Sequence, residues 1–120
     1  MNYFHTVVAT LLLAFTASAF AHVEMESTTP KSGSTLTQSP PAIELHFDDP
    51  AKLTSVTVTG SDKIERRLTF KATDKENIFN VTEPKLAVGR NVVKWKALSR
   101  DGHVAGGSLV FVIKPAAKTK

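Results

Sequence analysis

Two side chains that could hold a metal ion lie near the C-terminal end of the chain. Asp101 and His103 are separated by a single glycine, and they stand between two strand-like runs, 92–98 and 108–113. An Asp-x-His pair is a weak signal in isolation, because most such pairs are solvated turn residues. This pair gains weight from His22, a third metal-binding side chain, which processing should place at the start of the mature protein.

The first 21 residues have the pattern of a secretory signal peptide. They contain no Asp, Glu, Lys or Arg, and the apolar run 7–15 is too short to span a bilayer. The sequence Ala19-Phe20-Ala21 has the small-x-small form that signal peptidase cleaves. The basic residue usual before the apolar run is absent, and a membrane anchor or a buried helix is the alternative. We therefore expect a signal peptide at 1–21 and a mature domain at 22–120, which is 120 − 21 = 99 residues.

A histidine at a mature N-terminus offers two nitrogen ligands, the free α-amine and the imidazole Nδ1, which can close a six-membered chelate ring. His103 would add a third nitrogen and Asp101 a carboxylate oxygen. Three nitrogens and one carboxylate in a tetragonal arrangement favour Cu(II). Zinc on His22, Asp101 and His103 is the alternative, although its tetrahedral preference suits a flat chelate less well. The chain has no cysteine, so a metal must be bound by nitrogen, oxygen or the thioether of Met25.

Composition narrows the classes of function. The net charge is +4 at pH 7, but no arginine-rich stripe alternates with aromatic residues, so nucleic acid is not an expected partner. The chain lacks a Gly-x-Ser-x-Gly motif, a cysteine nucleophile, a P-loop and a dinucleotide fingerprint. Asp48 and Asp49 are adjacent carboxylates, but neighbours on a strand point to opposite faces, so they are predicted to be strand-end residues. We expect a binding protein and not an enzyme.

Apolar residues alternate with polar ones at period two, which predicts an all-β domain. About seven short strands, with turns every 8 to 12 residues, are typical of a Greek-key β-sandwich of immunoglobulin-like shape. One strand should end at Asp48-Asp49-Pro50, and Gly106-Gly107 should form a tight bend. His46 is predicted to point outward from its strand, as a surface or supporting residue and not a ligand. The residues predicted to face the core include Ile43, Leu45, Phe47, Val93, Trp95 and Ala97.

The candidate ligands belong to a longer ordered pattern. It comprises His22 at the cleavage point, the segments 27–34 and 41–47, and the run 93–103 (Val-Lys-Trp-Lys-Ala-Leu-Ser-Arg-Asp-Gly-His), followed by Gly106-Gly107-Ser108. This pattern resembles the CopC family of periplasmic copper-resistance proteins, including its YobA-type members. The resemblance covers nearly all of the mature chain, and the run ending in Asp-Gly-His is its most specific part.

The resemblance implies a cupredoxin-like sandwich or barrel with a Cu(II) site. The N-terminal histidine and the Asp and His of the late motif match His22, Asp101 and His103. The implied function is copper buffering, delivery or resistance in the periplasm by a monomer, with a CopD-type inner-membrane copper transporter as partner. Some family members carry a Met-rich loop that holds Cu(I), but residues 60–74 contain neither Met nor His, so no Cu(I) site is carried over.

Two other functions fit part of the pattern. A histidine brace also serves oxidative copper enzymes such as lytic polysaccharide monooxygenases. A carboxylate from Asp101 would leave less room for oxygen at copper, and the chain shows no aromatic-rich platform for a polysaccharide. A metal-free sandwich used for adhesion or structure is the other alternative. Copper retention by the correctly processed protein separates the metal-free alternative from the other two.

Overall fold

The computed structural model describes residues 23–71 and 75–116, which form strands and no helix. No helix in these ranges could therefore cross a membrane. The predicted signal peptide and His22 lie outside the described residues. The predicted all-β sandwich is confirmed, with eight strands in place of about seven. The strands are β1 (Met25–Thr29), β2 (Thr35–Leu36), β3 (Ala42–Thr59), β4 (Glu65–Arg67), β5 (Thr69–Phe70), β6 (Glu76–Thr82), β7 (Gly89–Leu98) and β8 (Val104–Ile113).

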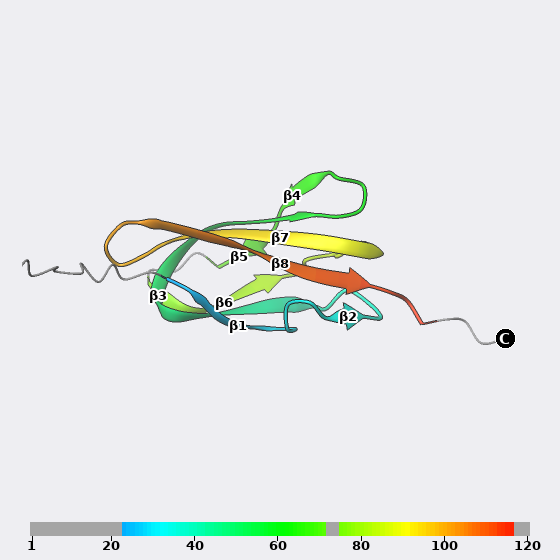
Figure 1. Cartoon of the computed structure of the whole chain (residues 1–120), viewed down its shortest axis with the longest axis horizontal. Helices are drawn as coiled ribbons and strands as arrows, with labels where there is room; N and C mark the ends of the chain where they lie inside the picture. Colours follow the sequence, from blue (N-terminus) through cyan, green and yellow to red (C-terminus); the bar gives the residue numbers. More distant parts are fainter. Residues whose placement is uncertain (1–22, 72–74, 117–120) are drawn as a thin grey trace, which may run out of the picture.

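The strands form two layers joined by β3 (Figure 1). The first half of β3 pairs with β1 and β6, whereas its second half pairs with β4 and β7. The hydrogen-bonded order is β2-β8-β7-β3-β6-β5, with β1 and β4 also on β3. Neighbours that are not consecutive in sequence, such as β3 and β7, are typical of Greek-key connections.

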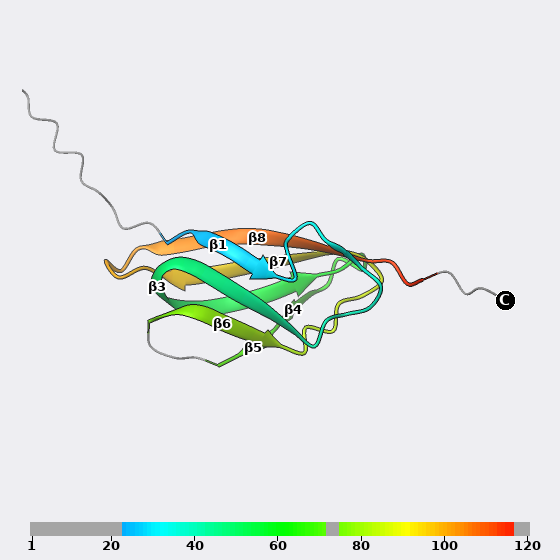
Figure 2. The same ribbon diagram turned by 90° about the horizontal axis from the view of Figure 1, so that it is seen from below.

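The prediction that Asp48-Asp49-Pro50 ends a strand is wrong. β3 runs through these residues to Thr59, and its register with β6 shifts between His46 and Ala51. Pro50 has no backbone N–H to donate, so the ladder is interrupted there and the strand bends without stopping. The bend, visible in Figure 2, lets one strand contribute to both layers.

The core lies between the layers and is centred on aromatic side chains. The ring centroid of Phe47 on β3 is 5.1 Å from that of Trp95 on β7 and 5.8 Å from that of Phe79 on β6, with edge-to-face geometry. The six predicted core residues are at most 5% exposed, which confirms the alternation on both strands.

The prediction of a bend at Gly106-Gly107 is also wrong, because both glycines lie within β8. Gly107 pairs with Trp95 across the sheet, and a Cβ at position 107 would lie 2.8–2.9 Å from three atoms of the indole. Glycine is needed here because the Trp95 ring covers the backbone. The pair of glycines therefore serves packing and not a turn.

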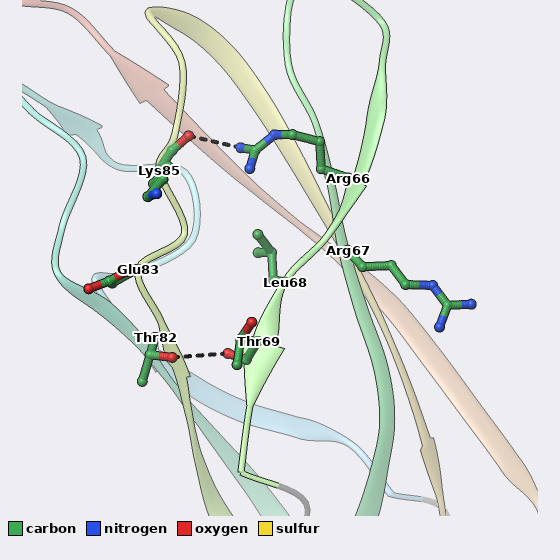
Figure 3. A pocket seen from close by; sticks show the side chains of 7 residues that line it. All are labelled: Arg66, Arg67, Leu68, Thr69, Thr82, Glu83 and Lys85. Atoms are coloured by element: carbon green, nitrogen blue, oxygen red, sulfur yellow. Dashed lines mark hydrogen bonds between the residues drawn. The ribbon is translucent and has the colours of Figure 1, made fainter.

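Residues 65–70 are split between the two layers. β4 pairs with β3 in one sheet and β5 pairs with β6 in the other, with buried Leu68 between them. The Arg66 guanidinium donates hydrogen bonds to the carbonyl oxygens of Pro84 at 3.2 Å and Lys85 at 2.8 Å. Figure 3 shows Arg66 reaching toward Lys85, whereas Arg67 extends to the opposite side of β4.

Candidate metal centre

The turn that carries Asp101 and His103 joins β7 to β8, as predicted. Its backbone closes on itself, since the Ser99 N–H donates to the carbonyl of His103 at 2.9 Å and the Gly102 N–H donates to that of Ser99 at 3.0 Å. Gly102 has a φ of 85°, a left-handed conformation that favours glycine. A short closed loop of this kind fixes the side chains at positions 101 and 103 relative to each other.

The Asp101 carboxylate is bound from three sides by the turn. Its Oδ1 accepts hydrogen bonds from the Ser99 hydroxyl and from the His103 N–H, the latter at 3.2 Å. Its Oδ2 lies 2.7 Å from His103 Nδ1. The hydroxyl of Ser99 first, and then the contacts with His103, hold the pKa of Asp101 well below its usual range. Asp101 is therefore a carboxylate at any pH near neutrality.

Both candidate ligands reach the surface. The side chain of His103 is 64% exposed and that of Asp101 is 31% exposed. Ser99, which orients Asp101, is 6% exposed and is part of the folded interior. The hydrogen bond from Ser99 to Asp101 was not predicted from the sequence, although Ser99 stands two residues before Asp101 in the motif. The arrangement is an accessible carboxylate–imidazole pair on a rigid base.

The two predicted ligands that lie within the described residues, Asp101 and His103, are brought together. Within residues 23–71 and 75–116, no group of three or more His, Cys, Asp or Glu side chains could hold a metal ion. His22 lies outside the described residues, so the predicted chelate at the N-terminus stays a prediction. Asp101 and His103 need at least one further donor to complete a centre of the kind predicted.

The beginning of the described chain is tied to the bend in β3. Val23 is buried in the core at 4% exposure. The Glu24 N–H donates to Asp48 Oδ1 at 2.9 Å, and the Asp48 N–H donates to the Glu24 carbonyl at 3.0 Å. Residues 23 and 24 are therefore held in place by packing and by two hydrogen bonds.

The same bend is tied to the turn between β7 and β8. Arg100 Nε donates to Asp49 Oδ2 at 2.8 Å, so adjacent carboxylates at positions 48 and 49 hold two different segments. Figures 1 and 2 show the start of β1 and this turn at the same end of the molecule. Sequence reasoning assigned no function to Asp48 and Asp49. Their adjacent positions on a strand, which turn the two side chains to opposite faces, were the signal that they could hold different segments.

His46 is on β3 and not on the turn that carries Asp101 and His103. It is on the part of β3 that pairs with β1 and β6, opposite Ser27 and Ile78, and its imidazole contacts the Glu44 carboxylate. Its side chain is 30% exposed, which confirms the predicted outward orientation.

The folded chain is a cupredoxin-like β-sandwich that presents a carboxylate–imidazole pair at one end. The sequence profile of the CopC domain matches residues 25–114, a range that includes Asp101 and His103. The chain belongs to the CopC family.

Relatives with known names agree with this assignment. Copper resistance protein C of Xanthomonas campestris pv. juglandis is 27% identical over 119 residues, covering 91% of this chain and 93% of that protein. The crystal structure of CopC from Methylosinus trichosporium OB3b superposes with a TM-score of 0.68 at 26% identity, covering 82% of this chain and 100% of the other. PcoC from Escherichia coli, described as a methionine-rich copper resistance protein, gives a TM-score of 0.55 at 27% identity, covering 78% and 100%.

Proposed function

We propose that this protein is exported to the periplasm and binds Cu(II) through His22, Asp101 and His103, in copper buffering, delivery or resistance and without enzymatic activity. The observation that carries the proposal is the 2.7 Å separation of Asp101 Oδ2 and His103 Nδ1 in a closed turn. The names of its relatives, which are copper resistance proteins, support copper as the metal.

The separation of these two atoms suits two ligands of one metal ion. Metal–nitrogen and metal–oxygen bonds of about 2.0 Å at a right angle place the two donor atoms about 2.8 Å apart. The observed 2.7 Å therefore matches a hydrogen bond in the metal-free protein and two neighbouring ligands in the metal-bound one. Copper would replace the shared proton with little movement of either side chain.

The missing donors would come from the N-terminus after cleavage. A free α-amine and an imidazole on His22 would raise the set to three nitrogens and one carboxylate, which favours Cu(II). Val23 is buried in the core, and Glu24 is hydrogen-bonded to Asp48 at the bend in β3. Arg100, in the turn between β7 and β8, is hydrogen-bonded to Asp49 at the same bend. These contacts support an approach of residue 22 to Asp101 and His103. The signal peptide at 1–21 and the mature domain at 22–120 belong to this proposal.

The biological setting completes the proposal. The chain has two methionines, and only Met25 would remain after cleavage, so the proposal is confined to Cu(II). We expect a monomer that passes copper to a CopD-type transporter in the inner membrane.

The test compares two forms of the protein. One begins at His22, and the other carries a single extra glycine before it, which removes the free amine from the chelate. Cu(II) titration should give tight binding of one ion by the first form and much weaker binding by the second. Electron paramagnetic resonance of the first form should show nitrogen donors. Equal affinity in the two forms would exclude the N-terminal chelate, and no binding in either would favour a metal-free structural module.

A further inference from the structure

One outer face of the sandwich carries a row of cations, of which only Arg100 forms an ion pair with another described residue. We propose that this face, here called the basic stripe (Arg67, Lys94, Lys96, Lys52 and Arg100), binds an extended acidic segment of a partner protein. It is distinct from the candidate metal centre, although one end reaches the turn that carries Asp101 and His103.

The register of the strands places the first three cations together. Thr57 on β3 is directly opposite Arg67 of β4 on one side and Lys94 of β7 on the other. Ser55 is opposite Lys96 in the adjoining row. Directly paired residues project from the same face of a sheet. Neighbouring strands lie about 4.8 Å apart, so the backbones at Arg67 and Lys94, one on each side of Thr57, are separated by about 10 Å.

These cations surround a hollow with a polar floor. Arg67, Lys94 and Lys96, together with Ser55, Thr57 and Glu65, line a cavity of about 380 Å³. Lys94 and Lys96 are exposed, and neither they nor Arg67 form an ion pair with another described residue. Like charges gathered on one sheet face repel each other. Glu65 is the one acidic residue among those that line the hollow, so an anion there would relieve the repulsion that remains.

The stripe continues along β7 to the turn. Lys52 on β3 is opposite Leu98, and both residues line a second cavity of about 540 Å³ with Arg100, Ser99, Gly102 and Lys75. The one ion pair of the stripe within the described residues joins Arg100 to Asp49. From Lys94 to the end of β7 at Leu98 is four steps, about 13 Å at 3.3 Å per residue, and Arg100 extends the stripe into the turn.

The shape of the stripe selects its partner. An extended segment of about six residues would cover this part of β7 and reach the turn, and its carboxylates could enter the two cavities and meet the lysines. A lipid bilayer is broad and cannot reach the floor of a hollow beside β4. The large apolar side chains exposed among the described residues, Ile64, Ile78, Val88 and Val104, line neither cavity. Val104 lies opposite Leu98 on this face, but one apolar side chain provides little area for insertion into a membrane.

The neighbouring cavity on the other side of β4 is smaller than the two cavities of the stripe. It has a volume of about 280 Å³, and both Arg66 and Arg67 line it. The Arg66 guanidinium is hydrogen-bonded to the carbonyls of Pro84 and Lys85, and Figure 3 shows the bond to Lys85. Arg66 is therefore less available to an anion than Arg67, Lys94 and Lys96, which line the cavity on the stripe side of β4.

The test uses the metal-free protein, so that its failure is distinct from a failure of copper binding. A fluorescein-labelled hexapeptide of aspartate is titrated by fluorescence anisotropy against wild type, Lys94→Glu/Lys96→Glu and the matched control Lys71→Glu/Lys114→Glu. Lys71 and Lys114 are exposed and lie outside the stripe, and both double variants change the net charge equally. Circular dichroism confirms folding of each.

We expect the stripe variant to bind the peptide about tenfold more weakly than wild type and the control to lose less than about threefold. Equal losses in the two variants would show attraction by net charge only and would overturn the proposal. So would the absence of peptide binding by wild type at about 50 mM salt. Vesicles of phosphatidylglycerol form the last arm. Binding of wild type to vesicles but not to the peptide would assign this face to a membrane and overturn the acidic segment.

Discussion

Replacement of Gly107 by alanine should destabilise the sandwich by displacing the Trp95 ring. The new Cβ would lie 2.8–2.9 Å from three indole atoms, closer than carbon atoms approach without displacement. Trp95 is 5% exposed, and its ring is 5.1 Å from that of Phe47 between centroids. The indole therefore cannot move without disturbing the aromatic centre of the core.

The magnitude follows from two opposing effects. Overpacking of a close-packed core costs about 1–3 kcal/mol of unfolding free energy. The loss of glycine from the unfolded chain returns about 0.4–1 kcal/mol. The net cost is about 1–2 kcal/mol, which for a domain of this length lowers the melting temperature by about 5–15 °C.

Thermal unfolding followed by the fluorescence of Trp95, the only tryptophan, measures this change directly. Gly60→Ala is the matched control, because a Cβ at position 60 would lie 3.5 Å from its nearest neighbours, which is an ordinary contact. Its melting temperature should stay within a few degrees of wild type, since a change of 1 kcal/mol corresponds to about 4–8 °C in a domain of this length. In a Trp95→Phe background, followed by circular dichroism, the cost of Gly107→Ala should shrink because the smaller ring leaves room. If Gly107→Ala melted at or above the wild-type temperature, the packing argument would be refuted.

Three further predictions concern the candidate metal centre. His103→Ala should abolish tight Cu(II) binding, whereas His46→Ala should leave the Cu(II) affinity unchanged. Asp101→Asn should weaken Cu(II) binding and shift the electron paramagnetic resonance spectrum. Loss of Cu(II) binding in His46→Ala together with unchanged binding in His103→Ala would contradict the assignment of the ligands. Cu(II) affinity should fall from about pH 8 to about pH 5, because an α-amine of ordinary pKa about 8 and an imidazole must lose their protons to bind. Asp101 stays ionised over this range, because the hydrogen bonds of the turn lower its pKa, so the loss of affinity comes from the nitrogen donors. A Cu(II) affinity that is constant from about pH 8 to about pH 5 would contradict this and indicate a site of carboxylates alone. Asp49→Asn should weaken Cu(II) binding less than Asp101→Asn with little change in stability, because it loosens only the contact to Arg100, and equal losses would make Asp49 a ligand candidate.

Local features of the chain were predictable because they depend on short-range rules. Alternation at period two placed Phe47 and Trp95 in the core and turned His46 outward, since successive side chains on a strand point to opposite faces. The turn between two apolar runs placed Asp101 and His103 together, since residues two apart in a closed loop must lie close to each other.

Contacts between distant segments were decided by the tertiary structure. Alternation says which face a residue takes but not which strand lies beside it, so β3 appeared as two strands separated by Pro50, and Gly107 appeared as a bend until its pairing with Trp95 was known. The pairing of Asp48 with residue 24 and of Asp49 with residue 100 likewise depends on how the two sheets close around the bend. Residue types and their order determined which donors this protein has for a metal. The packing of the sheets decided that the start of the chain and the distant turn are both anchored to the bend in β3, because only the folded sandwich brings segments far apart in sequence within hydrogen-bonding distance.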